Sequence, residues 1–395
     1  MIHACFALLL LMPADGPTPD ERFRALRDAF DAAHAEFLRL ANDATTPEKQ
    51  AKATNHPGCR NGNFSPGFLD LARKYPGTPA AEDALLWIGS HVFQTPDSEE
   101  ARTRLVKDHA TSPRLGPTLG FQGHYDGGSP GSDGFFREIL AQNPHREIQG
   151  LATYWLARVL KNKADWSREA RKPSFQKRSY LTETYGEDWD ERLRKLDPEA
   201  LDREADALFE RVAKFYVDIP HNDKRRNPGT LGDAASGYLY EARNLAIGKT
   251  PPDFAGTDLD GRPFRLADVR GKVVVLDFGS HFYCGLCRET YPQFRAMTKR
   301  LEGHKFALIS INAEPEKLVG DLKDAWKTEG NTWPCLFDGN WEGPIQKAWN
   351  VQSFPTIYVL DAQGVIRHKE LRGKDLDEAV DKLVAELEGT GATRP

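Results

Sequence analysis

Cys284 and Cys287 are separated by two residues and lie at a predicted junction between a strand, 272–278, and a helix, 287–301. The amino end of a helix presents unpaired amide donors and the positive end of the helix dipole, which together lower the pKa of a thiol placed there. We therefore expect Cys284 to be the nucleophilic thiol. The two-residue spacing brings Cys287 close enough to resolve a mixed disulfide and release a substrate.

Two neighbouring side chains add to this expectation, and two alternatives compete with it. Arg288 adds positive charge, and His281 is expected to add more when it is protonated. Half of a zinc site is one alternative, but such a site needs two further ligands, and the sequence has no second cysteine pair at metal-binding spacing. We predict no metal and no cofactor beyond the redox-active disulfide. A static disulfide is the other alternative.

The remaining cysteines are scattered along the chain, unlike those of a small disulfide-stapled domain. Cys335 occupies a predicted strand position that is normally apolar, so its expected role is packing. Cys59 lies in a polar loop, and no partner is assigned to it. Cys5 lies within an apolar run at the amino terminus.

The elements that must position the pair begin after residue 248, where Pro251 and Pro252 favour an extended linker. Strands buried in a mainly parallel sheet are expected to read as continuous apolar runs. The predicted strands and helices beyond 272–301 are 306–311, 316–329, 356–360, 365–371 and 375–387, with a turn at 361–364. This order predicts an α/β domain over 248–390 with an antiparallel edge.

Residues 16–247 are predicted to be an all-α domain of helical hairpins. A repeat displaced by 68 residues matches Phe68, Pro76, Ala84 and Trp87 with Phe136, Pro144, Ala152 and Trp155. A looser third copy starts at Phe209 and resumes at Tyr238. We expect irregular loops at 110–134 and 161–196. Residues 68–88 resemble tetratricopeptide-like repeats, and such hairpins stack into a solenoid with an extended surface. That surface either binds a protein partner or only builds a scaffold.

Composition limits the function further. Hydrophobic residues make up 39% of the chain, charged residues make up 28%, and the net charge is -5, so the chain should fold and nucleic acid is an unexpected partner. Residues 4–12 are apolar and match the length of a secretion signal, so we predict a signal segment at 1–15 and a periplasmic or otherwise exported protein. A cytoplasmic protein is the alternative. No run is long enough for an integral membrane span.

The second domain resembles the TlpA-like, redoxin-type thiol-disulfide oxidoreductases of the thioredoxin fold. The segments that carry the resemblance are Pro252-Asp253-Phe254, Asp258-Leu259-Asp260-Gly261, 271–278, Cys284 to Cys287 with Pro292, Trp333-Pro334, 336–339, Trp349-Asn350-Val351 and Phe354-Pro355-Thr356. The resemblance implies that Pro355 is a cis-proline facing the cysteines and that the backbone of Phe354 pairs with a bound peptide. It also implies that Asp277 is a buried carboxylate that takes the proton from Cys287.

The sequence departs from the family pattern around the cysteines. Residues 279–283 carry one residue more than is usual between the strand and the first cysteine. Tyr283, which we expect to contact substrate, replaces a common tryptophan. Thr290 stands where many exported members have glutamate. Leu286 occupies the position of a proline or histidine that helps to tune the redox potential in relatives.

These observations predict an enzyme, a thiol-disulfide oxidoreductase, with protein disulfides or dithiols as substrates and an upstream electron donor. The helical region would position it on a protein partner. The alternatives are a peroxiredoxin-like thiol peroxidase and a helical-repeat binding protein whose cysteine pair is only structural.

Overall fold

The computed structural model divides the chain into two compact units, residues 1–236 and 237–395. The predicted signal segment, 1–15, lies outside the described residues. The structure describes residues 16–125, 127, 131–172, 175, 177, 182–183, 185–221, 229–341 and 343–389.

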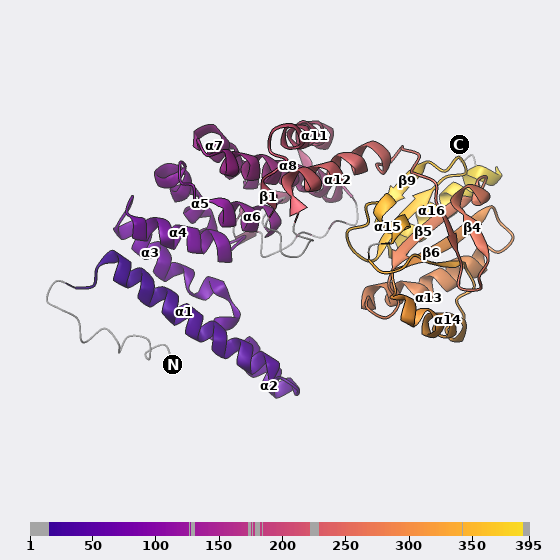
Figure 1. Ribbon diagram of the computed structural model, residues 1–395, viewed down its shortest axis with the longest axis horizontal. Helices are drawn as coiled ribbons and strands as arrows, with labels where there is room; N and C mark the ends of the chain where they lie inside the picture. The colour runs from indigo at the N-terminus through magenta and orange to yellow at the C-terminus, as the bar shows by residue number, and fades with distance from the viewer. Residues whose placement is uncertain are drawn as a thin grey trace. The chain divides into compact units, whose positions relative to one another are not determined.

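The first unit is helical, which confirms the predicted fold class of this region (Figure 1). Its helices are α1 (Pro19–Asn42), α2 (Pro47–Thr54), α3 (Ser65–Lys74), α4 (Pro79–His91), α5 (Pro96–His109), α6 (Gly116–Tyr125), α7 (Ser132–Gln142), α8 (Arg146–Ala170), α10 (Trp189–Arg194), α11 (Pro198–Phe215) and the first part of α12 (Leu231–Asn244). Single 3₁₀ turns, η2 (Pro57–Cys59) and η3 (Asn61–Asn63), precede α3.

Four of these helices begin with the same dipeptide, Thr-Pro. The threonine is the N-cap, its hydroxyl accepts a hydrogen bond from the third amide of the helix, and the proline occupies a position that needs no amide donor. The four caps are Thr18, Thr46, Thr78 and Thr95. Local sequence therefore determines where these helices start.

The 68-residue repeat contains two helical hairpins in each period, not one. α3 and α4 form the first copy and α7 and α8 the second, as the sequence predicts, but α5 and α6 form another hairpin between them. The expected loop at 110–134 is therefore wrong, because α6 lies inside it. The residues 34 positions after Phe68 and Ala84 are Arg102 and Thr118. Because these do not match the aromatic residue and the alanine of the repeat, the extra hairpin was missed.

Close packing between successive hairpins explains two glycines that are also 34 residues apart. A Cβ atom at Gly89 would lie 2.6 Å from the Thr118 side chain, and one at Gly123 would lie 2.3 Å from the ring of Trp155. Alanine would not fit at either position without movement of the neighbouring helix. The hairpins thus approach each other at equivalent points.

The expected loop at 161–196 is also largely helical. α8 continues to Ala170, and α10 places Trp189 in a small core with Ala170 and Leu193. Most of the charged residues of α8 and α10 that suggested a loop lie on the surface, whereas Lys163 and Asp190 are buried. In the third copy, Phe209 is buried on α11, and the insertion before α12 contains the paired strands β1 (Pro220–His221) and β2 (Gly229–Thr230).

The second unit is an α/β domain with a five-stranded sheet, which confirms the predicted fold class (Figure 1). The strand order is β7-β6-β5-β8-β9, in which β5, β6 and β7 are parallel and β8 and β9 are antiparallel to their neighbours. The strands of this sheet are β5 (Val273–Gly279), β6 (Phe306–Asn312), β7 (Cys335–Phe337), β8 (Thr356–Leu360) and β9 (Ile366–Lys369). A separate hairpin joins β3 (Ala255–Thr257) to β4 (Pro263–Arg265).

Both faces of this sheet are covered by apolar cores. On one face pack α13 (Gly285–Arg300), α14 (Val319–Thr328) and α16 (Gly373–Glu388). On the other face pack α15 (Pro344–Ala348), the 3₁₀ turn η4 (Leu266–Val269) and several side chains of the preceding chain. Another 3₁₀ turn, η5 (Glu316–Leu318), leads into α14. This two-sided burial explains why β5 is apolar along its length except at Asp277.

The second unit begins before the predicted boundary at 248. The division lies within α12, because the end of that helix packs on the sheet: Leu245 is fully buried in the core, and the Tyr240 hydroxyl donates to the carbonyl of Ala348 at 2.8 Å. Glu241 also forms an ion pair with Lys369 at 2.5 Å.

Within the described residues, no helix combines the length and hydropathy that a membrane span requires.

Candidate active site

Cys284 and Cys287 form a disulfide at the start of α13, with their Cα atoms 5.3 Å apart. Cys284 is the N-cap of this helix, and its Sγ accepts a hydrogen bond from the backbone amide of Cys287 at 3.1 Å. The structure therefore places Cys284 where helix amides and the helix dipole stabilise a thiolate.

The two sulfurs differ in their access to solvent. Cys287 is fully buried, whereas Cys284 is partly exposed. Cys287 packs against the end of β5, where a Cβ at Gly279 would lie 3.3 Å from the Cys287 Sγ. Of the two sulfurs, only that of Cys284 is therefore accessible from solvent.

Asp277 lies beneath the disulfide on β5 and is 1% exposed. Burial raises its pKa to about 7, a shift that a hydrogen bond from Ser310 and the charge of Arg372 partly oppose. The Ser310 hydroxyl donates to Asp277 Oδ2 at 2.9 Å and accepts a hydrogen bond from the Trp333 indole at 2.9 Å. Asp277 Oδ1 has no hydrogen-bond partner in the described part of the chain.

The free oxygen of Asp277 and the sulfur of Cys287 flank the same point above β5. A Cβ built on Gly279 would lie 3.9 Å from Asp277 Oδ1 and 3.3 Å from Cys287 Sγ. Glycine leaves this space open between the carboxyl group and the sulfur. Both atoms therefore lie within 3.9 Å of one point beside Gly279.

The Phe354–Pro355 peptide bond is cis, as the family resemblance implied. Thr356, the next residue, pairs with Phe278 at the end of β5, so sheet register places Pro355 beside the strand end that leads to the cysteines. Arg372 donates a hydrogen bond to the Pro355 carbonyl at 3.0 Å. Tertiary structure thus places Cys287 and Asp277 beside the end of β5 and the cis-proline at the adjoining start of β8.

Large apolar side chains remain exposed around this site. Tyr283 is 62% exposed, Leu286 is 56% exposed, and Phe282 is also exposed. Trp341 is 56% exposed and stacks on Phe354 with ring centroids 4.2 Å apart. Trp341 was missed by sequence reasoning, and its only signal was an aromatic residue in a polar, glycine-containing loop.

His281 is 4% exposed, and burial lowers the pKa of its imidazole below the ordinary value, which disfavours the protonated form that was expected to add positive charge. Its ring stacks on Tyr291 with centroids 5.8 Å apart, and its Nε2 lies 3.5 Å from Glu329. Arg288, which is exposed, remains a source of local positive charge.

The two cysteines outside the pair lie in different environments. Cys335 is buried in the core on β7, and burial raises the pKa of its thiol. Cys59 is partly exposed and has no disulfide partner. Among the described residues, no group of histidine, cysteine, aspartate or glutamate side chains is arranged to hold a metal ion.

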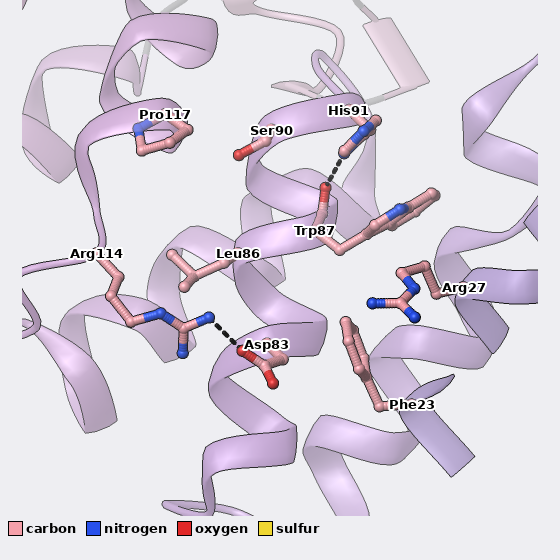
Figure 2. Close-up of a pocket in the computed structure, with 9 residues that line it drawn as sticks. All are labelled: Phe23, Arg27, Asp83, Leu86, Trp87, Ser90, His91, Arg114 and Pro117. Carbon is pink, nitrogen blue, oxygen red and sulfur yellow. Dashed lines mark hydrogen bonds and ion pairs between the residues drawn. The ribbon is translucent and has the colours of Figure 1, made fainter. Parts of the chain in front are cut away.

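A second concave site lies in the helical unit (Figure 2). This groove has a volume of about 690 Å³ and is lined by Phe23, Arg27, Asp83, Leu86, Trp87, Ser90, His91, Arg114 and Pro117. Its aromatic wall is fixed, because Trp87 stacks between Phe68 at 4.0 Å and His91 at 4.8 Å. Arg114 donates a hydrogen bond to Asp83. The Arg27 guanidinium points toward the groove beside Trp87, and its ion pair with Asp28 is long, at 3.5 Å.

The sheet order, the disulfide at a helix start and the adjacent cis-proline define the second unit as a thioredoxin-fold redox domain. A family model described as the AhpC/TSA family matches residues 247–369. The thioredoxin-like protein YneN of Bacillus subtilis (strain 168) is 33% identical over 131 residues, 32% of this chain and 74% of that protein. The chain belongs to this family of thioredoxin-like thiol-disulfide oxidoreductases, which confirms the predicted resemblance.

Further similarities cover the same part of the chain. The thiol-disulfide oxidoreductase ResA of Geobacillus kaustophilus (strain HTA426) is 29% identical over 131 residues, 33% of this chain and 72% of that protein. The crystal structure of the thioredoxin domain of a thiol-disulfide oxidoreductase from Bacteroides vulgatus is 28% identical, with a TM-score of 0.33. The aligned region covers 36% of this chain and 99% of that one.

Proposed function

We propose that this chain exchanges disulfides with polypeptide substrates through Cys284 and Cys287. The observation that carries the proposal is the disulfide at the start of α13, where a partly exposed sulfur precedes a buried one above a carboxyl group of raised pKa. These are the parts that a thiol exchange cycle needs: a stabilised thiolate, a resolving thiol and a group that takes its proton.

In the reducing direction, the Cys284 thiolate attacks one sulfur of a substrate disulfide. The substrate S–S bond breaks, a mixed disulfide forms at Cys284, and the departing substrate thiolate takes a proton. Asp277 then accepts the proton of Cys287, and the Cys287 thiolate attacks the Cys284 sulfur. This step re-forms the internal disulfide and releases the second substrate thiolate, so two electrons pass from the protein to the substrate. An upstream donor must return two electrons and two protons.

The surroundings of Cys284 favour a polypeptide over a small disulfide. We propose that the backbone of Phe354 pairs with an extended substrate segment and that Tyr283 contacts its side chains. Trp341, which stacks on Phe354, would extend the same apolar surface. Burial of this exposed aromatic area by a peptide would contribute to affinity.

Catalysis of disulfide reduction tests the proposal. We expect the full-length chain, supplied with dithiothreitol, to reduce a fluorescent peptide disulfide at least about tenfold faster than dithiothreitol alone, because a stabilised thiolate attacks faster near neutral pH. Equilibration with glutathione buffers gives the midpoint potential and thereby the direction of exchange. No acceleration, together with a midpoint too negative for exchange with glutathione, would instead support a static disulfide.

The peroxidase alternative receives little support from the site. The residue three positions before Cys284 is His281, which is buried and stacked on Tyr291. We expect hydrogen peroxide to oxidise Cys284 slowly compared with the peptide disulfide exchange. Rapid peroxide consumption would reverse this ranking.

We further propose that the helical unit holds a polypeptide partner in the groove of Figure 2. The hairpins resemble tetratricopeptide-like repeats, and the groove combines an aromatic wall with the loosely paired cation of Arg27. Charge complementarity favours a partner segment that carries an acidic side chain beside an apolar one.

Substitution of Arg27 tests this groove. We expect Arg27→Glu to weaken binding of an acidic, leucine-containing peptide by about tenfold, because one favourable charge contact becomes repulsive. Fluorescence anisotropy with the full-length chain measures this change. Arg24→Glu, on the same helix but outside the groove, is the matched control. Equal affinities for all three proteins would remove the groove as the binding site.

We propose that the protein works outside the cytoplasm. Disulfide substrates persist in oxidising compartments, and residues 4–12 match the apolar part of a secretion signal. Cell fractionation with an antibody against the chain separates this location from the cytoplasmic alternative.

A further inference from the structure

Glu314 is a buried carboxylate that binds the loop preceding Cys284, and sequence reasoning did not single it out. It follows β6 by two residues and is fully inaccessible to solvent. Its Oε1 accepts hydrogen bonds from the Ser280 hydroxyl at 2.7 Å and from the backbone amide of Phe282 at 2.8 Å. One oxygen therefore joins the chain after β6 to two points of the active-site loop.

The same contact extends to the residue next to Cys284. The Ser280 hydroxyl donates to Glu314 and accepts a hydrogen bond from the backbone amide of Tyr283 at 3.1 Å. Glu314 and Ser280 thus hold the amides of Phe282 and Tyr283, the two residues before the nucleophile. No residue intervenes between Tyr283 and Cys284.

Glu314 is itself rigidly supported. Its backbone amide donates to the Asn312 side chain at 3.0 Å, and the amide of Ala313 donates to the Gly279 carbonyl at 3.0 Å. These bonds continue the parallel pairing of β5 and β6, in which Gly279 lies opposite Asn312. The carboxylate is therefore fixed relative to the strand that carries Asp277 and supports Cys287.

Burial of this carboxylate is costly for a purely structural contact. Desolvation of an acidic group is unfavourable unless its oxygens are well bonded, and Glu314 Oε2 is buried without a hydrogen-bond partner among the described residues. A neutral side chain could close a loop at a smaller cost. The retained carboxylate, placed beside a redox site, points to a role in the reaction.

We infer that Glu314 is a positioning residue for exchange at Cys284, acting through Ser280 and the loop 280–283. The inference rests on the proposed disulfide exchange. The loop carries one residue more than the family pattern, and a longer loop has more conformations in which Cys284 leaves the N-cap of α13. The hydrogen bonds of Glu314 and Ser280 to the loop disfavour these conformations. The Cys284 sulfur therefore stays at the helix amides and in line with an incoming disulfide. A displacement of about 1 Å at a reacting atom can reduce a rate by about a hundredfold.

Three variants separate positioning from charge. Glu314→Gln removes the charge but keeps an oxygen that can accept both hydrogen bonds, and Glu314→Ala removes both of these bonds. Ser280→Ala removes the two bonds of the Ser280 hydroxyl, to Glu314 and from the Tyr283 amide, but keeps the bond from the Phe282 amide to Glu314. The reaction of the reduced full-length protein with 5,5′-dithiobis(2-nitrobenzoic acid) between pH 5 and 9 reports the reactivity of Cys284. Peptide disulfide turnover gives kcat and KM.

We expect Glu314→Ala and Ser280→Ala to lower the rate at pH 6 by about tenfold or more, because Cys284 loses contact with the helix amides. The loss should be smaller at pH 9, where the thiol ionises without help from the helix. The Gln variant should stay within about threefold of wild type, and kcat should fall more than KM rises. Glu388→Ala is the control, because Glu388 accepts the Lys305 amide at 2.7 Å at the opposite end of β6.

Several results would overturn the inference. Unchanged pH profiles and turnover in a folded Glu314→Ala variant would do so, and so would an equal loss in the Gln and Ala variants. If Glu314→Ala does not fold, a Ser280→Ala variant whose rate depends on pH as in wild type decides against the positioning role of Glu314. A wild-type protein that does not exchange disulfides would refute the proposed function instead, whereas an active wild type with unaffected variants refutes only the role of Glu314.

Discussion

Replacing Cys284 with serine is expected to abolish disulfide exchange, with a loss on the order of 10³-fold or more in turnover. A serine hydroxyl is not ionised near neutral pH and cannot form the mixed disulfide on which the cycle depends. The measurement is the initial rate of peptide disulfide reduction with dithiothreitol as donor. Full activity of Cys284→Ser would remove the proposed mechanism.

Replacing Cys287 with serine should have a different effect, because the first attack remains possible and only the resolving step is lost. We expect this variant to accumulate a covalent mixed disulfide with a cysteine-containing peptide, visible by mass spectrometry and reversed by reductant. Cys59→Ser is the matched control, since Cys59 is partly exposed and unpaired. A mixed disulfide trapped on Cys59 rather than Cys284 would contradict the assignment of the nucleophile.

Asp277→Asn is expected to stabilise the oxidised protein above pH 7 while it slows the reaction. The folded-state pKa of Asp277, about 7, lies above the ordinary value of 3.8, so the folded protein holds this proton more tightly than the unfolded chain does. The group therefore favours folding most at low pH, and this contribution is lost as the pH rises from about 4 to about 7. The full difference is up to about 4 kcal/mol.

Unfolding experiments on the oxidised full-length chain measure this effect. The free energy of unfolding of Asp277→Asn minus that of wild type should be larger at pH 8 than at pH 5, because asparagine does not titrate. Ser310→Ala removes the hydrogen bond to Asp277 Oδ2. In this variant the free energy of unfolding should therefore fall more between pH 5 and pH 8 than it does in wild type. A pH-independent difference between wild type and Asp277→Asn would show that Asp277 does not titrate in this range.

The same substitution should slow the resolving step by about a hundredfold, because asparagine cannot accept the proton of Cys287. Stopped-flow mixing of the reduced variant with a peptide disulfide should show a normal first phase and a delayed release of the second thiol. The delay should shorten as the pH rises toward the pKa of the Cys287 thiol. Equal delays in wild type and variant would assign the proton transfer to another group.

The class of this protein could be predicted from the sequence because its signals are local. The Cys284 and Cys287 pair, the apolar run of β5 and the helix that follows are adjacent in the chain, and each has a characteristic period or spacing. The Thr-Pro caps of the helical unit are local in the same sense. The family resemblance added Asp277 and Pro355, which spacing alone would not have related to the cysteines.

Tertiary structure decided the features that depend on contacts between distant segments. Glu314 meets Ser280 only because β6 pairs with β5, and Trp341 meets Phe354 only because their loops pack together. Burial lowers the pKa of His281, which a reading of residue types cannot anticipate. The hairpin of α5 and α6 was missed because Arg102, buried and bonded to Gln122, replaces the apolar residue of the repeat. Sequence patterns reveal what each segment can form, whereas burial and pairing between segments determine which side chains act together.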